Sequence, residues 1–257
     1  MPQAAEQTRQ LCASGYKEIV ITGIEIASYG RDLPEKTSPA ELFSAVCTAA
    51  GNVRIRLGSL EPRVVDREFC EVLSRCSNLC DHFHLSLQSG CDDTLRRMGR
   101  KYGTERFFRS VELLREYFPG CAITTDLITG FPGESDGEFS LTMEFIRRCR
   151  FSAMHVFPYS ERRGTKAAAM GDRVPIRVRE ERASAASAAA EEMRADYLSQ
   201  QVGKVLPVLF EAPDGGFSRG HAPNYTLIMA PGEVHGTVCP TRITGSDGMT
   251  LTGEILS

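Results

Sequence analysis

The 257-residue sequence predicts an α/β protein, in which repeated strand–helix units form an open parallel barrel and a small all-β barrel follows. Three observations predict this class. Strand starts recur every ~30–40 residues with helical patterns between them, which is the period of repeated βα units. One sharp strand, glycine turn and helix occupy the middle of the chain. Beyond Gly203 the helical periodicity ends, and short strands alternate with turns rich in Pro and Gly.

The stretch Ala122–Glu134 is the clearest of the strand–helix units. Its β-branched residues suit a buried strand, and the run G-F-P-G from Gly130 to Gly133 cannot continue one. Acidic residues at the start of the following helix suit its positive end. Ligands of parallel α/β proteins bind at such turns, at the carboxyl ends of the strands. Asp126, a carboxylate inside the apolar strand, is therefore a candidate site residue.

The other elements of the first part are predicted by the same signals. Apolar and β-branched runs that stop at Gly, Ser or Pro predict strands over residues 17–22, 53–57, 82–87 and 152–158. Apolar residues at helical spacing predict helices over residues 6–14, 39–50, 66–76 and 104–118. The chain begins inside the helix that would connect a first strand to the second, so we expect a barrel that is open at its amino end.

Two further segments follow the open barrel. Residues 175–201 form a long predicted helix rich in alanine and charge, which we interpret as a tether rather than a core element. Short strands are predicted over residues 205–210, 225–229, 234–240 and 250–255. The predicted domains are therefore the open barrel at residues 1–170, a linker helix at 171–202 and a β-barrel at 203–257.

The composition is that of an ordinary globular protein. A quarter of the residues are charged and the net charge is −3, which gives no gross electrostatic case for nucleic acid. No apolar run approaches the ~18 residues that a membrane span needs, and the first residues do not form a signal peptide. The nine scattered cysteines favour reduced thiols over a disulfide framework. We therefore expect a cytoplasmic protein without a membrane partner.

Small or polar residues follow every strand of the first part or lie near its end. They are Gly23 and Glu25, Ser59 and Glu61, Gln88 and Ser89, Asp126 with Thr129 and Gly130, and Phe157 with Tyr159. Such residues also favour turns, so each one alone has a plain structural explanation. Five strand ends that all carry them favour one shared ligand pocket at the carboxyl face. His82, His84 and His155 lie within strands, and we interpret them as core histidines rather than metal ligands.

Four motifs, in order along the chain, make the sequence similar to a known family. They are S-L-E-P at 59–62, H-L-S-L-Q-S-G-C-D at 84–92, T-D-L-I-T-G-F-P-G-E at 125–134 and H-V-F-P-Y-S-x-R-x-G-T at 155–165. Together they resemble the radical S-adenosylmethionine (SAM) methylthiotransferases of the MiaB and MtaB type. T-G-I-x-x-x-S-Y-G at 22–30 and H-A-P-N-Y at 221–225 are most similar to the MtaB branch. That branch adds a methylthio group to N6-threonylcarbamoyladenosine beside the tRNA anticodon.

The resemblance implies a partial (βα)6 radical SAM barrel of the TIM-like kind, missing its first strand, followed by a TRAM domain, a small β-barrel that docks RNA. It also implies S-adenosylmethionine as cofactor and tRNA as partner. The implied SAM-binding residues are Gly23 and Glu25 near the methionine amino group, Ser59 and Glu61 near the ribose and methionine, Gln88, Ser89 and Asp126 along the pocket, Thr129, Gly130 and Phe131 at the adenine, and Phe157 and Tyr159 packed on it. The implied RNA-binding residues are Arg219, His221 and Asn224. Because residues 203–257 carry three basic side chains against five carboxylates, their RNA role rests on the resemblance.

The iron–sulfur ligands of that family are not found in this sequence. Radical SAM chemistry needs three cysteines in a C-x3-C-x2-C loop, and no such spacing is present. The nearest thiols, Cys70, Cys76 and Cys80, fall away from the predicted pocket, so we predict no metal site and assign no catalytic residue. The family enzyme holds two [4Fe-4S] clusters in segments that precede the start of this chain, and none is expected here. We therefore expect a truncated enzyme, inactive alone, whose missing N-terminal domain is its partner.

Three functions remain open from the sequence. The first is a tRNA methylthiotransferase, and the second is a non-catalytic RNA-binding remnant that acts through residues 203–257. The third is the sister enzyme that modifies a ribosomal protein. An upstream reading frame encoding C-x3-C-x2-C would decide between the first two, and the motifs S-G-C-D and H-A-P-N-Y disfavour the third.

Overall fold

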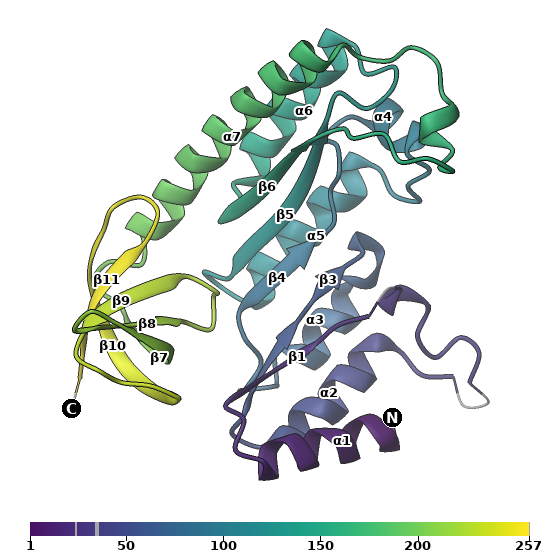
Figure 1. The fold of residues 1–257 in the computed structure, drawn as a ribbon. Coiled ribbons are helices and arrows are strands. Elements are labelled where there is room, and N and C mark those ends of the chain that lie inside the picture. Colours follow the sequence, from purple (N-terminus) through teal and green to yellow (C-terminus); the bar gives the residue numbers. More distant parts are fainter. Residues whose placement is uncertain (24, 34–35, 257) are drawn as a thin grey trace.

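The computed structural model describes residues 1–23, 25–33 and 36–256, so that Ile24 of the T-G-I motif lies outside the described residues. A large α/β part and a small β-barrel are joined by one long helix (Figure 1). The sheet of the large part has two sections. The first pairs β1 (Glu18–Ile21) with β2 (Arg54–Leu57), and the second has the order β3 (Ser59–Leu60), β4 (His82–Leu85), β5 (Ala122–Thr129) and β6 (Ala153–Pro158). All pairings are parallel, which confirms the predicted βα repeats.

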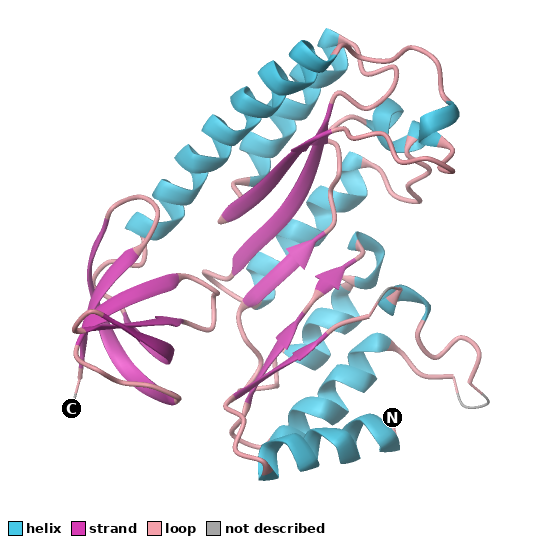
Figure 2. Ribbon diagram, viewed as in Figure 1, coloured by secondary structure: helices cyan, strands magenta, loops and turns pink. Residues whose placement is uncertain are grey.

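Helices connect these strands and pack along one side of the sheet (Figure 2). They are α1 (Pro2–Ala13), α2 (Pro39–Ala50), α3 (Arg67–Leu73), α4 (Asp92–Arg97), α5 (Thr104–Tyr117) and α6 (Asp136–Cys149), with short 3-10 turns η1 (Ile26–Ser28), η2 (Pro62–Val64) and η3 (Ala167–Ala169). Strand residues that face the helices, such as Ile55, Phe83 and Leu85, are fully buried. Side chains alternate along a strand, so the residues between them face the opposite, concave side of the sheet.

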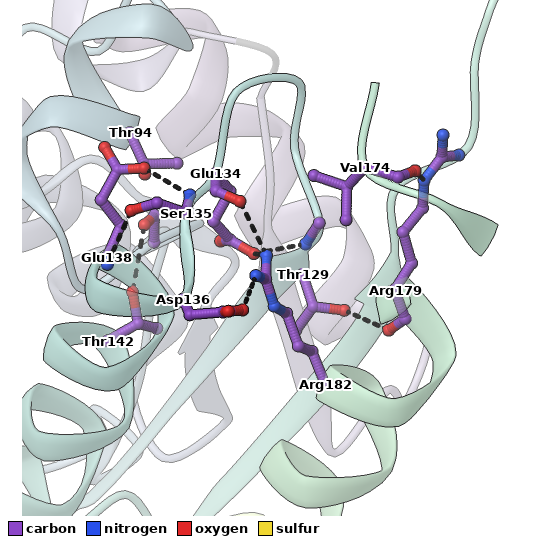
Figure 3. A network of polar contacts seen from close by, with 12 residues as sticks. Thr94, Thr129, Glu134, Ser135, Asp136, Glu138, Thr142, Val174, Arg179 and Arg182 are labelled. Carbon is purple, nitrogen blue, oxygen red and sulfur yellow. Dashed lines mark hydrogen bonds and ion pairs between the residues drawn. The ribbon is translucent and has the colours of Figure 1, made fainter. Parts of the chain in front are cut away.

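The turn between β5 and α6 has the backbone that its glycines predict. Gly130 and Gly133 have φ angles of 69° and 77°, in the left-handed region where glycine is favoured. Ser135 then caps α6: its hydroxyl accepts from the Glu138 backbone N–H, while the Glu138 carboxylate accepts from the Ser135 backbone N–H (Figure 3). This reciprocal cap satisfies two donors that the helix leaves free, so the strand ends and the helix begins at defined residues.

Helix α7 (Ile176–Ser199) packs on the large part, and the prediction of a tether is wrong. Ala186, Ala189 and Ala190 are buried in the hydrophobic core of that part. These residues and Arg182 share one face of the helix, because positions three and four apart are neighbours. Their small side chains allow the helix to approach β5 and β6, which it contacts. The domain boundaries near residues 170 and 203 remain a prediction.

Arg182 attaches α7 to the turn that follows β5. Its guanidinium lies 2.8 Å from Glu134 Oε2 and 2.6 Å from Asp136 Oδ1 (Figure 3). The Glu134 side chain is only 1% exposed, and it also accepts the Gly130 backbone N–H at 2.7 Å. One buried carboxylate therefore holds both the glycine turn and the long helix.

The small barrel is closed and has five strands in the order β10-β11-β9-β8-β7. These are β7 (Val205–Asp214), β8 (Phe217–His221), β9 (Leu227–Pro231), β10 (Thr237–Ser246) and β11 (Leu251–Ile255). The sequence pattern predicts a barrel but misses β8, which is short and polar and contains Gly220. A Cβ at Gly220 would lie 2.1 Å from the Leu209 carbonyl oxygen, so this strand approaches β7 too closely for any other residue. In the part of the chain that the structure describes, no helix has the length and apolarity needed to cross a bilayer.

Replacing Arg182 with methionine should destabilise the fold, because the Glu134 carboxylate would remain buried without its partner. We expect the free energy of unfolding to fall by about 3–5 kcal/mol in urea unfolding of the full chain at pH 7. Burial already raises the pKa of Glu134, and loss of Arg182 raises it further. The folded variant then binds more protons than the unfolded chain, so the loss should shrink as the pH falls toward 5.

Two further variants control this experiment. Adding Glu134→Gln to Arg182→Met should restore most of the stability, because no buried charge remains. Arg177→Met removes the exposed pair that Arg177 forms with Glu181 at 2.8 Å, and it should leave stability almost unchanged. Equal losses in Arg177→Met and Arg182→Met would contradict the assignment.

Candidate functional site

The concave face of the sheet carries a row of polar side chains. In the register of the parallel strands, Ser59 pairs with His84, His84 with Thr124, and Asp126 with His155. Residues in register on neighbouring strands point the same way, so these side chains share the concave face. The next row, toward the carboxyl ends, pairs Ile128 with Phe157, whose ring is 52% exposed. The face is therefore polar in its middle and apolar near its rim.

A chain of hydrogen bonds crosses this face. His82 Nε2 and His84 Nδ1 lie 2.9 and 3.0 Å from Thr124 Oγ1, and His84 Nε2 lies 3.4 Å from Asp126 Oδ2. The Asp126 carboxylate accepts, so His84 carries its proton on Nε2 and accepts at Nδ1. The Thr124 hydroxyl must then donate to His84 and accept from His82 Nε2–H. His82 Nδ1 becomes a bare acceptor, which agrees with its having no partner among the described residues.

The two histidines in this series of contacts, His82 and His84, are neutral at pH 7. Burial lowers the pKa of His82 to about 3, and the charge of Arg56 lowers it further. Burial also lowers the pKa of His84, against the opposing effect of Asp126. The two hydrogen bonds and the 3.4 Å contact of His84 Nε2 therefore all point toward Asp126, whose side chain is 33% exposed and can accept from a ligand.

The predicted residues at the ends of β1 and β3 lie around a group of mixed charge. Glu61 forms an ion pair with Arg63, and Glu25 is near enough to raise the pKa of Arg63 further. Ser59 is exposed on β3, and Gly23 lies where a Cβ would be 3.1 Å from Ile26 Cγ1. These residues offer carboxylates, a guanidinium and a hydroxyl on one side of the sheet.

Gln88 and Ser89, which follow β4, lie in different surroundings. Gln88 has a positive φ of 70°, and its backbone exchanges hydrogen bonds with β5, donating to the Asp126 carbonyl at 2.9 Å and accepting from Ile128 N at 3.0 Å. It therefore lies beside Asp126. The Ser89 side chain is fully buried instead, 3.4 Å from the Thr142 hydroxyl of α6, so it faces the helices.

Thr129, Gly130, Phe131 and Tyr159 form a second group, which the first turn of α7 covers. The Thr129 hydroxyl donates to the Arg179 carbonyl at 3.2 Å, and a Cβ at Gly130 would lie 2.3 Å from Arg179 Cγ. The rings of Phe131 and Tyr159 meet edge to face at 5.3 Å. The Tyr159 hydroxyl is buried and has no partner among the described residues. The structure thus separates the predicted site residues into an open group and a covered one.

The three predicted RNA-binding residues also differ from one another. Arg219 is exposed on β8. His221 lies 3.0 Å from Glu211 through Nδ1, and Asn224 is buried, its amide oxygen accepting from the backbone and hydroxyl of Thr226. Only Arg219 therefore presents its side chain outward.

The described residues do not fit an iron–sulfur cluster. Their only group of three close metal-ligand side chains is Cys91, Asp93 and Glu138, a set with one thiol. Glu138 in that group already accepts from Arg97 at 2.9 and 3.0 Å. Three converging thiols are what a radical SAM cluster needs, and we derive no chemical step through such a cluster.

The contact between His84 and Asp126 is a feature of the candidate site that the sequence did not predict. The signal was present in H-F-H, where His82 and His84 alternate with a buried Phe83 and therefore share a face. The partner of His84 could not be found in this way, because it depends on the register between β4 and β5.

Comparisons with known proteins show the family and the fold of the chain. A match to the Radical SAM superfamily covers residues 2–146. The chain is 38% identical over 239 residues to threonylcarbamoyladenosine tRNA methylthiotransferase MtaB of Bacillus subtilis (strain 168), covering 90% of this chain and 52% of that protein. It is 40% identical over 206 residues to MtaB of Thermotoga maritima, covering 80% and 47%. A tRNA-2-methylthio-N(6)-dimethylallyladenosine synthase of Syntrophomonas wolfei is 32% identical over 256 residues, covering 98% and 58%.

The chain spans about half the length of the curated relatives it matches. Among solved structures, coproporphyrinogen III oxidase (HemN) from Escherichia coli, described as a radical SAM enzyme, superposes with a TM-score of 0.58 at 14% identity. The match covers 99% of this chain and 64% of that one. At this identity the likeness shows the fold alone, and it confirms the predicted barrel class.

His82 should make the stability of the protein depend on pH. Its pKa is about 3 in the folded chain and ~6.5 in the unfolded chain, so the unfolded chain binds more protons between these values. Stability should therefore fall as the pH falls through this window. His82→Gln keeps an amide donor for Thr124 but does not titrate. Between pH 5.5 and 4.5 it should lose less free energy of unfolding than wild type, by about 1.4 kcal/mol per pH unit.

Urea unfolding of both proteins across this range measures the difference. His235→Gln is the matched control, because His235 is exposed on the small barrel and should show the wild-type pH dependence. Identical slopes for wild type and His82→Gln would show that His82 is not buried in the neutral form.

Proposed function

The chain belongs to the radical SAM superfamily, and we propose that it forms the SAM-binding and RNA-binding part of a tRNA methylthiotransferase that modifies N6-threonylcarbamoyladenosine. The observation that carries the proposal is the open, polar concave face, since it lies in a chain similar over most of its length to such enzymes. The tRNA-2-methylthio-N(6)-dimethylallyladenosine synthase described above has a lower sequence identity to this chain, 32%. A cytoplasmic place of action remains a prediction.

The open group of residues suits the parts of S-adenosylmethionine. A zwitterionic methionine end needs both an anion and a cation, and the pair Glu61–Arg63 supplies them beside Glu25. A ribose diol needs hydrogen-bond partners, which Ser59, Gln88 and Asp126 can provide. A purine favours an aromatic surface, and the exposed ring of Phe157 provides one. Bound here, SAM would supply the reactive group for the radical chemistry of the superfamily.

The residues of the covered group would act indirectly. Thr129 and Gly130 are held by α7, so their backbone positions the rim of the face rather than an open pocket. The buried Tyr159 hydroxyl, which lacks a partner among the described residues, is the one group there that could accept a ligand donor without losing an existing bond. We propose that a cluster-bearing N-terminal segment acts together with this chain, because the matched relatives are about twice as long.

We propose tRNA as the macromolecular partner, with a small electrostatic contribution from the β-barrel. Phosphate contacts determine affinity, and affinity follows the number of phosphates neutralised. The exposed Arg219 remains the proposed contact. His221 and Asn224 are engaged within the protein, so their role in RNA binding would be to shape the barrel.

A second candidate function has one observation in its favour. The described residues contain no three-thiol group, as a non-catalytic RNA-binding protein would also show. This alternative predicts RNA binding without SAM binding, so the two ligands should be tested separately.

SAM binding should depend on Asp126. Asp126→Asn removes the charged acceptor and should weaken binding of S-adenosylmethionine to the full chain about tenfold, since a hydrogen bond to a charged group is worth about 1.5 kcal/mol or more. Titration followed by NMR or calorimetry measures the change. Leu141→Ala is the control, because Leu141 is exposed on α6, away from the concave face. Equal affinities in both variants would remove Asp126 from the site, and no binding to wild type would favour the second candidate function.

RNA binding should depend on Arg219 in a salt-dependent way. Arg219→Ala should weaken binding to all tRNAs alike and reduce the slope of log affinity against log salt by about one. Filter binding of the full chain over a salt series tests this. Arg177→Ala is the matched control for the loss of one positive charge, because the Arg177 side chain is exposed on α7. A slope unchanged in Arg219→Ala would leave Arg219 as a solvated surface charge on β8.

A further inference from the structure

Residues 221–225, the H-A-P-N-Y segment after β8, dock onto the large part of the protein; we call them the docking segment. Arg54 of β2 donates to the carbonyl oxygens of Pro207 at 3.0 Å and His221 at 3.3 Å. Arg56, two residues further along β2, donates to the carbonyls of Pro223 at 2.7 Å and Ala222 at 3.2 Å. Two arginines of one strand thus bind the backbone of this segment.

The charges of the two arginines are balanced by one carboxylate. Glu18 of β1 lies 2.6 Å from Arg54 Nη2 and 2.7 Å from Arg56 Nε. The three side chains are at most 14% exposed. Two buried guanidiniums share one directly paired carboxylate, and the backbone carbonyls of the docking segment accept hydrogen bonds from their other N–H groups. Hydrogen bonds with a charged donor are about twice as strong as neutral ones.

Tyr225 ends the docking segment in an unusual conformation. Its φ of 62° lies in the left-handed region, which is uncommon for a residue with a large side chain and costs of order 1–3 kcal/mol. In this conformation its ring stacks on His82, at 5.0 Å and 26°, and on His221, at 4.9 Å and 18°, while the residue stays 52% exposed. The Arg56 guanidinium lies 4.8 Å from the same ring. The strained backbone is thus compensated by contacts with the large part.

His82 connects this contact to the concave face. One side of its ring lies against Tyr225, and its Nε2 contacts Thr124, which contacts His84, which contacts Asp126. A histidine ring that rotates breaks its hydrogen bond, so a neighbour that fixes the ring also fixes the direction of the chain. Tyr225 of the small barrel is therefore joined to Asp126 by its stacking contact with His82, two hydrogen bonds through Thr124 and the 3.4 Å contact between His84 and Asp126.

We propose that the docking segment seats the small barrel on β1 and β2, and that Tyr225 acts as a positioning residue for Asp126 through His82, Thr124 and His84. The role of this segment is then to link the small barrel to the concave face of the sheet. The inference concerns contacts within this chain, so it holds or fails independently of which substrate the protein modifies.

The test uses the full chain with ¹⁵N-labelled histidine, whose ring nitrogens report tautomer and hydrogen bonding by NMR. Tyr225→Asn removes the ring but keeps a residue that adopts positive φ readily. We expect the folded variant to show changed ring-nitrogen shifts for His84, which does not touch Tyr225, with partial loss of the pure Nε2–H form. Tyr225→Phe keeps the stacked ring and should restore the wild-type His84 spectrum. A residue that only added stability would not alter His84 in the folded protein.

Phe217→Asn is the matched control, because Phe217 is 45% exposed on the same barrel and lies at the other end of β8 from the docking segment. It should leave His84 unchanged. Arg56→Lys keeps the charge against Glu18 but loses the fork that binds two carbonyls, so it provides a second route if Tyr225→Asn does not fold. Hydrogen exchange should then increase in residues 221–226, together with the change at His84. A wild-type His84 spectrum in folded Tyr225→Asn, or in Arg56→Lys with faster exchange at 221–226, would overturn the proposal.

Discussion

Glu18, Arg54 and Arg56 form a buried ion group whose guanidiniums also donate to backbone carbonyls of the small barrel, and the arrangement of the two parts depends on these contacts. A buried charge without a partner costs several kcal/mol. The register that places Glu18 opposite Arg54 allows the direct ion pair, and the backbone carbonyls of residues 221–223 accept further hydrogen bonds from both guanidiniums. The small barrel therefore has one favourable seat on the sheet, at the point where β1 and β2 begin.

The concave face depends on a similar buried pairing at the opposite end of the strands. Arg182 and Glu134 hold α7 across the turn after β5, and this contact covers Thr129 and Gly130 while leaving Asp126 and Phe157 open. The size and polarity of the open face thus follow from where α7 lies. Helix α7, which the sequence analysis interprets as a tether, therefore borders the concave face.

Predictions from the sequence succeeded where a local signal was strong. They failed where contacts between residues distant in the sequence determine the structure. Ser38 and Ser135, each followed three residues later by glutamate, begin α2 and α6 as capping boxes. Helix α7 carries charge around most of its surface, so nothing local shows that Ala186 and Ala189 face a core. Strand β8 has a glycine and polar residues, and only its pairing with β7 and β9 makes it a strand.

The sequence by itself determined the order of strands and helices in the large part, the family and the residue types at the strand ends, because alternation, capping and motif spacing are local properties of the chain. The tertiary structure alone decided which of those residues share a face. Ser89 faces the helices, Asn224 is buried in its own turn, and His84 meets Asp126, since each depends on the register of strands or on the packing of another element. Residues that look equivalent in the sequence differ in exposure, because contacts with residues distant in the sequence cover one and leave another open.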